Sequence, residues 1–434
     1  MMENYSPGPT PGMSPAVSHD CRRIFLTGAT GVLGAHILKT LLAESNDRLF
    51  CLVRAATLEQ GRDRLLSFLR TYDPEEKLKA SFMARVTPVL GDVTQDRLGL
   101  SEADYHALAD QVEATIHAAA STNLFLSFRR TEPINVGGTR RMIEFVLQTR
   151  SKYLCYISTY TVMGDKVFDP TFRFHEHQLD VGQGFAHMAY QQSKFIAENM
   201  LREAQSRGLQ WNVMRPGQVF GETETGFYPN GQTNVSGLFL DIFKTVIETG
   251  VAFRSETHFD VCPVDFVSKA VIHLGLERAD RFQTYHLLNP EPKTYTQVVN
   301  AIRNLGYPIQ HVHQDEYRRL LFEGGLTAAN LRSSAPDPLG LCPEYKSATT
   351  KGFRWWFQRD PFDFSQSAVT DCSWTYDILK AEGITCPPMD EKLIGTYVTA
   401  GVRAGYFPEA LGGEAPAPAA ANAGGAARFL RAEV

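Results

Sequence analysis

The sequence lacks long hydrophobic runs. Its apolar stretches around residues 143–147 and 245–250 fall well short of the ~20 residues that a membrane-spanning helix needs. Residues 1–20 contain no basic segment followed by an apolar one, so no secretory signal is predicted. We therefore expect no membrane partner and a cytoplasmic location.

The sequence also lacks an excess of positive charge and any paired-cysteine motif. Its formal net charge is -5 at pH 7, which offers no basic surface for nucleic acid. The seven cysteines are scattered without CxxC spacing, a pattern that gives neither a disulfide framework nor a zinc site. We therefore predict no nucleic-acid partner and no bound metal.

What is present is the composition of an ordinary globular protein, with 43% hydrophobic and 21% charged residues. At 434 residues the chain is long for one compact domain, so a large domain and a smaller one are expected. We place an α/β domain at 21–290, with a loop insertion at about 216–258, and a smaller, mainly helical substrate domain at 291–411. The Pro-rich segment 1–20 and the Ala/Gly/Pro-rich segment 412–434 are predicted to be a disordered linker and a flexible tail.

Short apolar runs alternate with amphipathic stretches through the first half of the chain. Strands are expected at 22–28, 48–54, 85–92, 114–120, 152–158 and 210–217, and helices at 32–44, 58–69, 135–148 and 188–205. This alternation predicts a Rossmann-type, doubly wound parallel sheet covered on both faces, with ligands at the carboxyl ends of the strands. Later helices are expected at 293–306, 314–322 and 389–402.

Three glycines spaced three apart follow the first predicted strand and open the first predicted helix. A side chain at Gly28 would obstruct the turn, one at Gly31 would block a pyrophosphate, and a large one at Gly34 would prevent close helix packing. The helix N-terminus offers free N–H groups to the phosphates. We predict that a dinucleotide binds here, through Gly28, Thr30, Gly31, Val32, Leu33 and Gly34.

The end of the second predicted strand selects the dinucleotide. NAD enzymes place an acidic residue there to bind the ribose 2′-hydroxyl, whereas this chain has Arg54. A guanidinium suits a 2′-phosphate, so NADPH is the predicted cofactor, and Arg64 is positioned to add a second charge. Solvated surface arginines remain the alternative for both residues.

The ends of the third and fourth predicted strands supply further cofactor contacts. Asp92 and Val93 in "GDVT" stand where an adenine ring would lie, although Asp92 also fits a plain turn residue. Ala118 and Ala119 in "IHAAASTN" are small enough to let the backbone approach the cofactor.

Tyr190 and Lys194 are four residues apart on a predicted helix and therefore share a face. We expect the lysine ammonium to lower the pKa of the tyrosine and to hold the ribose hydroxyls of the cofactor. Thr159 lies at the carboxyl end of the preceding strand, where its hydroxyl can stabilise an oxyanion. Ser158 and Thr161 compete for that role, because a hydroxyl that caps the strand end would look the same.

Together, "TGATGVLG", "ISTYTVMG", "YQQSK" and "RPGQVFG" resemble an extended short-chain dehydrogenase/reductase. More narrowly, "LVRA", "NVGGT" and the stretch from Arg23 to Phe407 resemble the thioester reductase family. That family includes terminal reductase domains of nonribosomal peptide and polyketide synthases and of carboxylic acid reductases. The resemblance implies a catalytic set of Thr159, Tyr190 and Lys194. It also implies cofactor binding by the residues above and by Asn123, Pro216, Gly217 and Val219.

The resemblance further implies NADPH-dependent reductive release of an acyl or peptidyl thioester as an aldehyde, which a second round would reduce to a primary alcohol. The expected partner is an acyl or peptidyl carrier protein with a phosphopantetheine arm, facing the domain at 291–411. The chain is then a monomer or the terminal domain of a multidomain synthase. Three alternatives remain: a fatty acyl-CoA reductase, a sugar-nucleotide epimerase or dehydratase, and a non-catalytic dinucleotide-sensing regulator. Arg54 disfavours the second, and Tyr190 with Lys194 disfavours the third.

Overall fold

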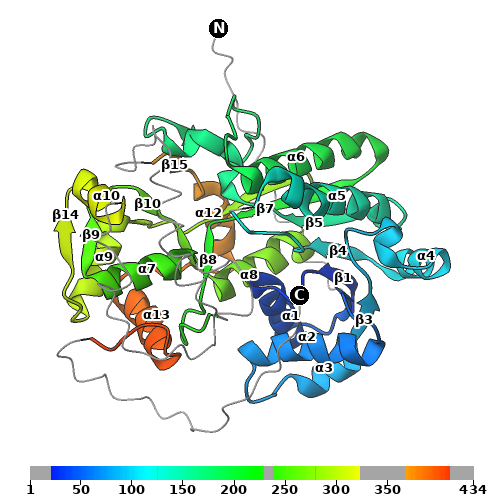
Figure 1. The fold of residues 1–434 in the computed structure, drawn as a ribbon. Coiled ribbons are helices and arrows are strands. Elements are labelled where there is room, and N and C mark those ends of the chain that lie inside the picture. The colour runs from blue at the N-terminus through cyan, green and yellow to red at the C-terminus, as the bar shows by residue number, and fades with distance from the viewer. Residues whose placement is uncertain (1–20, 125, 229–237, 279, 323–366, 411–434) are drawn as a thin grey trace.

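The computed structural model describes residues 21–124, 126–228, 238–278, 280–322 and 367–410 (Figure 1). The linker and the tail predicted at the two ends of the chain lie outside these described residues. Within them, no helix is both long enough and apolar enough to cross a bilayer.

Seven parallel strands form the main sheet, in the order β12-β7-β5-β4-β1-β2-β3. They are β1 (Arg23–Thr27), β2 (Arg48–Val53), β3 (Val86–Leu90), β4 (Ala114–His117), β5 (Tyr153–Ile157), β7 (Gln210–Pro216) and β12 (Gln283–Leu287). The strand order reverses between β1 and β4, which is the doubly wound arrangement that the sequence predicted. The predicted fold class is therefore confirmed, and β12 is a strand that the sequence pattern did not reveal.

Helices cover both faces of this sheet. One face packs against α1 (Val32–Glu44), α2 (Leu58–Tyr72) and α8 (Val264–Ile272), and the other against α4 (Glu102–Gln111), α5 (Phe128–Val146) and α6 (Ala189–Ala204) (Figure 1). The short α3 (Lys79–Arg85) leads into β3. Strand side chains alternate between the two apolar clusters, since successive residues of a strand point to opposite faces.

Helix α5 begins at Phe128, well before the predicted start at residue 135. It therefore includes Pro133, which precedes the predicted start. Pro133 is the sixth residue of the helix, where it removes one backbone hydrogen bond. Two residues later, the Asn135 side chain is hydrogen-bonded to the backbone of Ser121 and to the hydroxyl of Ser193, which anchors this part of the helix.

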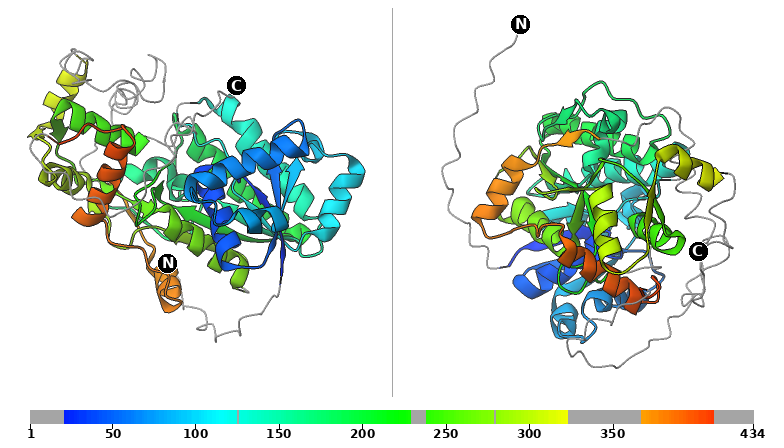
Figure 2. Two further views of the ribbon diagram at one scale, coloured as in Figure 1. Left: turned by 90° about the horizontal axis from the view of Figure 1, so that it is seen from below. Right: turned by 90° about the vertical axis from the view of Figure 1, so that its left-hand side faces the viewer.

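A smaller group of elements lies beyond the carboxyl edge of the sheet, seen on the left of Figure 1 and in both views of Figure 2. It contains α7 (Leu238–Thr249), α9 (Tyr295–Asn304), α10 (Gln314–Phe322) and α13 (Glu391–Arg403), so the three later helices predicted from the sequence are confirmed. Its short strand pairs are β8 (Gln218–Phe220) with β11 (Val261–Pro263), β9 (Val251–Phe253) with β14 (Gln310–Val312), and β10 (His258–Phe259) with β13 (Lys293–Thr294). An apolar cluster of aromatic and branched side chains holds the group together.

Two further elements late in the chain contact elements outside this group. Helix α12 (Ser373–Ala381) packs against β12, where the Trp374 ring stacks on Tyr285 with ring centroids 5.3 Å apart. Strand β15 (Val369–Thr370) pairs with β6 (Arg173–Phe174). Residues late in the sequence therefore contribute to both parts of the fold.

Candidate active site

A cavity of about 720 Å³ opens at the carboxyl edge of the sheet, where the strand order reverses. Every residue that the sequence analysis assigned to cofactor binding or catalysis lines it, from Gly28 at the end of β1 to Val219 on β8. Ser158 and Thr161, the two alternatives to Thr159, line it as well. The fold thus brings together residues that are far apart in the sequence.

The glycine turn is closely packed against its surroundings. Gly28 has φ +79°, and a Cβ there would lie 2.6 Å from the backbone of Ala118 and Ala119. A Cβ on Gly34 would lie 2.0 Å from the carbonyl oxygen of Gly28. At Gly31, in contrast, the nearest atom would be 3.4 Å away, and the residue lines the cavity. The turn therefore leaves its open side for a ligand, next to the N–H groups that begin α1.

Two arginines meet where a ribose 2′-substituent is expected. The Arg64 guanidinium donates a hydrogen bond to the carbonyl oxygen of Arg54 at 3.2 Å. Burial and the charge of Arg54 both lower the pKa of Arg64. The Arg54 side chain is 71% exposed, and its Nη1 lies 4.0 Å from an Asp92 oxygen. Both arginines line the cavity, and two neighbouring guanidinium groups are suited to bind an anionic group such as a phosphate.

Asp92 serves the turn after β3 and also lines the cavity. Its Oδ1 accepts hydrogen bonds from the backbone N–H and the hydroxyl of Thr94, both at 2.8 Å. This is the geometry of an Asx turn, so the turn role weighed in the sequence analysis is present. The cavity-facing position of Asp92 and Val93 is compatible with the adenine role, which stays a prediction.

Lys194 is buried on α6 and held by β5. Its Nζ donates to the carbonyl oxygen of Ile157 at 2.8 Å and to the hydroxyl of Tyr156 at 3.2 Å. Burial lowers the pKa of this ammonium to about 7, against the opposing charge of Glu198. The lysine is therefore fixed in direction and close to its titration point at neutral pH.

Tyr190 does not behave electrostatically as the sequence suggested. Burial raises the pKa of Tyr190, and Lys194 directs its hydrogen bonds to Tyr156 and Ile157. The expected lowering of the pKa of Tyr190 by the ammonium is therefore wrong for this arrangement. A neutral phenol at working pH holds its proton and can donate it to a substrate oxygen.

The three hydroxyl candidates after β5 have different partners. The Ser158 hydroxyl donates to Glu198 Oε1 at 2.5 Å, in a buried contact. The Thr159 hydroxyl accepts from the backbone N–H of Thr161 at 3.3 Å and shares a 2.9 Å hydrogen bond with the Thr161 hydroxyl. When Thr161 donates in that bond, the proton of Thr159 is available to an oxyanion. Ser158 is committed to Glu198, which favours Thr159.

Sequence reasoning missed the buried ion pair beneath these residues. Arg215 on β7 contacts both Glu198 oxygens, at 3.0 and 2.7 Å, and both side chains are fully buried. Arg215 also lies 3.2 Å from His286 Nε2 on β12. The sequence did contain part of the information needed to find this pair. Glu198 lies four residues after Lys194 and eight after Tyr190, on the same helix face.

The matching family model is described as male sterility protein, an NAD-binding family, and it covers residues 26–271. The chain is 29% identical to a linear gramicidin synthase of Brevibacillus parabrevis over 88% of its own length. It is 30% identical to a carboxylic acid reductase of Mycobacterium tuberculosis over 64% of its length. The chain spans 7% and 25% of the lengths of these two relatives.

A solved structure gives a likeness over nearly the whole chain. The terminal R domain from the myxalamid PKS-NRPS biosynthetic pathway superposes with a TM-score of 0.78 and 29% identity, covering 91% of this chain and 94% of that one. The chain therefore belongs to the male sterility protein family and, within it, to the thioester reductase domains of nonribosomal peptide and polyketide synthases, oxidoreductases that bind a nicotinamide cofactor.

Proposed function

We propose that this protein uses NADPH to reduce an acyl or peptidyl thioester carried on the phosphopantetheine arm of a carrier protein. One hydride transfer releases an aldehyde, and a second hydride transfer would convert that aldehyde to a primary alcohol. The observation that carries the proposal is the meeting of Thr159, Tyr190 and Lys194 in the same cavity as the glycine turn and the arginine pair.

The residues that line the cavity fit NADPH, the reduced nicotinamide adenine dinucleotide phosphate. The glycine turn leaves room for a pyrophosphate, and Arg54 and Arg64 offer two cations to the 2′-phosphate. The backbone from Pro216 to Val219 borders the cavity and would lie beside the nicotinamide. Lys194 would hold the ribose hydroxyls of the bound cofactor, since this residue of α6 lines the cavity.

When bound, the dihydronicotinamide supplies a hydride to the carbonyl carbon of the thioester. The Thr159 hydroxyl donates a hydrogen bond to the carbonyl oxygen, and Tyr190 transfers its phenolic proton to that oxygen as the C=O electron pair moves onto it. The resulting hemithioacetal loses its hydroxyl proton and breaks its C–S bond, giving the aldehyde and the free thiol. Lys194, held in place by Tyr156, would contribute its positive charge to the cavity that Tyr190 also lines.

The carrier protein is proposed as the partner because the relatives and the similar solved structure are parts of synthases. The arm would enter at the carboxyl edge of the sheet, which faces the smaller group of helices. A monomer, or the terminal domain of a longer synthase, suits a reductase that must meet a tethered arm.

The test compares one acyl chain presented on a carrier protein, on a pantetheine mimic and on free CoA. NADPH oxidation is followed for the wild type, for Tyr190→Phe and for the control Tyr105→Phe, a buried tyrosine on α4. We expect turnover with the carrier thioester, its loss in Tyr190→Phe, and wild-type rates in the control. Equal turnover of the CoA thioester would support a fatty acyl-CoA reductase, and wild-type rates in Tyr190→Phe would refute the catalytic assignment.

A further inference from the structure

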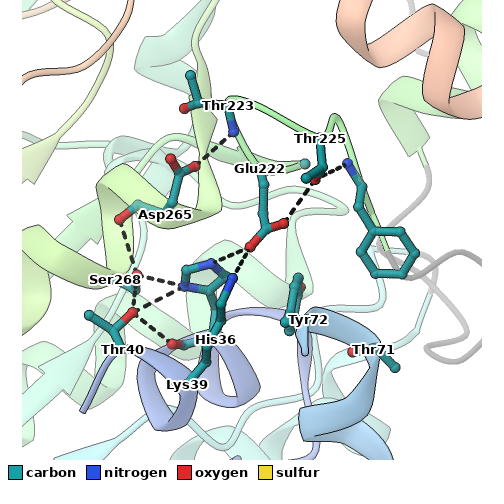
Figure 3. A network of polar contacts seen from close by, with 12 residues as sticks. His36, Lys39, Thr40, Thr71, Tyr72, Glu222, Thr223, Thr225, Asp265 and Ser268 are labelled. Atoms are coloured by element: carbon teal, nitrogen blue, oxygen red, sulfur yellow. Dashed lines mark hydrogen bonds and ion pairs between the residues drawn. The ribbon is translucent and has the colours of Figure 1, made fainter. Parts of the chain in front are cut away.

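A buried carboxylate, Glu222, lies outside the catalytic set and on a loop that leaves the cavity and returns to it. Val219 on β8 and Tyr228 at the far end of the loop both line the cavity. Between them, residues 221–228 pass over α1, the helix that begins at the glycine turn (Figure 3). No catalytic step described above uses Glu222, so its buried charge needs another explanation.

Three donors hold this carboxylate. His36 Nε2 lies 3.0 Å from Oε1, the Lys39 ammonium donates to the same oxygen, and the Thr225 hydroxyl donates to Oε2 at 2.8 Å (Figure 3). Burial raises the pKa of Glu222, but hydrogen bonds from His36 and Lys39 outweigh it and lower the pKa to about 2. Glu222 is therefore ionised at every working pH. Such a buried charge is stable only while its partners stay in place.

The α1 side of this contact is rigid. His36 is 3% exposed, and its Nδ1 shares a 2.8 Å hydrogen bond with the Ser268 hydroxyl on α8. The Tyr72 ring packs edge-on against the His36 ring at 4.9 Å, and its hydroxyl donates to the carbonyl oxygen of Val32 at 3.2 Å. Val32 is the first residue of α1 and lines the cavity. Glu222 is thus connected through one short helix to the glycine turn.

The other side of the loop packs against α13. The Tyr397 hydroxyl donates to the carbonyl oxygen of Gly221 at 3.3 Å. Gly226 has φ +65°, and a Cβ there would lie 2.5 Å from the carbonyl oxygen of Thr396. The loop therefore has little freedom on this side, and the Glu222 contacts decide how closely it approaches α1.

We propose that Glu222 is a positioning residue that fixes the wall formed by Val219 and Tyr228 against the glycine turn and so sets the affinity for the reduced dinucleotide. The inference rests on the proposed function for the identity of that ligand. Glu222 itself does not line the cavity, so it acts through Tyr228 and the loop backbone. Without the carboxylate, only a fraction of the molecules has this wall in the binding-competent position. The apparent Kd for the dinucleotide rises in inverse proportion to that fraction.

The experiment measures NADPH binding in the absence of thioester, by titration of the reduced nicotinamide fluorescence. Glu222→Ala is expected to raise the Kd by about tenfold. Glu224→Gln, an exposed glutamate in the same loop, is the matched control and should leave the Kd unchanged. In the double variant with Tyr228→Ala, the two effects should not add, because both remove the same wall.

Lys39→Met breaks the same ion pair from α1 and gives a second variant if Glu222→Ala does not fold. A wild-type Kd in folded Glu222→Ala or Lys39→Met, or additive effects with Tyr228→Ala, would overturn the proposal. The binding readout also separates the two proposals. A wild type that binds NADPH but reduces no thioester contradicts the proposed function and leaves the role of Glu222 intact.

Discussion

Replacing Tyr156 by phenylalanine should change the pH at which the enzyme loses activity. The Tyr156 hydroxyl accepts one of the two hydrogen bonds donated by Lys194 Nζ, and the second goes to the Ile157 carbonyl oxygen. Phenylalanine keeps the ring, whose centroid lies 4.6 Å from that ammonium, and removes only the hydroxyl. The substitution therefore isolates one interaction with the charged form of Lys194.

The size of the effect follows from the chemistry of that hydrogen bond. A hydrogen bond to a charged group contributes about 1.5–3 kcal/mol, and one pKa unit corresponds to about 1.4 kcal/mol. Glu198 supplies a compensating negative charge, so we expect the pKa of Lys194 to fall below its value of about 7 by roughly one unit. Because the ammonium is the active form, activity is lost as pH rises through this pKa, and the alkaline limb should move to lower pH.

The assay is the pH profile of kcat for thioester-dependent NADPH oxidation. Tyr153→Phe is the matched control, since Tyr153 lies on the same strand, is equally buried and faces the opposite side of the sheet. The other titratable groups near Lys194, namely Tyr190, Glu198 and His117, are the same in both variants. An alkaline limb at the same pH in both variants would refute the reasoning.

Three further predictions address the same site. Tyr190→Phe should abolish turnover while the Kd for NADPH stays within about twofold of the wild type, because the phenol acts on the substrate oxygen. Kinetics and binding titrations on the same protein check this prediction, and a large loss of NADPH affinity would contradict it. Arg54→Ala should weaken the binding of NADPH by about tenfold or more and leave the binding of NADH unchanged, since one charge-assisted contact to the 2′-phosphate is lost. An equal loss of affinity for both dinucleotides would show that Arg54 does not contact the 2′-phosphate. The free energy of unfolding of Lys194→Met should increase less steeply with pH, between about pH 7 and 10, than that of the wild type. The buried lysine has a pKa of about 7 when folded, against the ordinary lysine value of 10.5 when unfolded, so the unfolded chain binds more protons in that window and stability increases with pH. Denaturant titrations at several pH values test this, and identical slopes in both proteins would contradict it.

The parts of the fold that carry a local signal could be predicted from the sequence. The apolar run before Gly28, the helical spacing after Gly31 and the later strand runs each depend on residues that are neighbours in the chain. The common cavity of the predicted site residues followed from them, because the carboxyl ends of parallel strands must meet at one edge of the sheet.

The contacts that hold the site together have no such signal. Arg215 meets Glu198 from another strand, and Glu222 meets His36 across a long stretch of sequence. Neither pair has a periodicity that sequence inspection can detect. The pKa of Tyr190 was mispredicted for a related reason, since the expectation considered the nearby charge of Lys194 but could not include the burial of both groups.

The most direct test of the central claim is the ratio of NADPH oxidised to thiol released from a carrier-bound acyl thioester. We predict that the two events are coupled, with one NADPH per thiol for an aldehyde product or two for an alcohol. Thiol release without NADPH oxidation, or tight NADPH binding with neither event, would contradict the assignment of this protein as a thioester reductase.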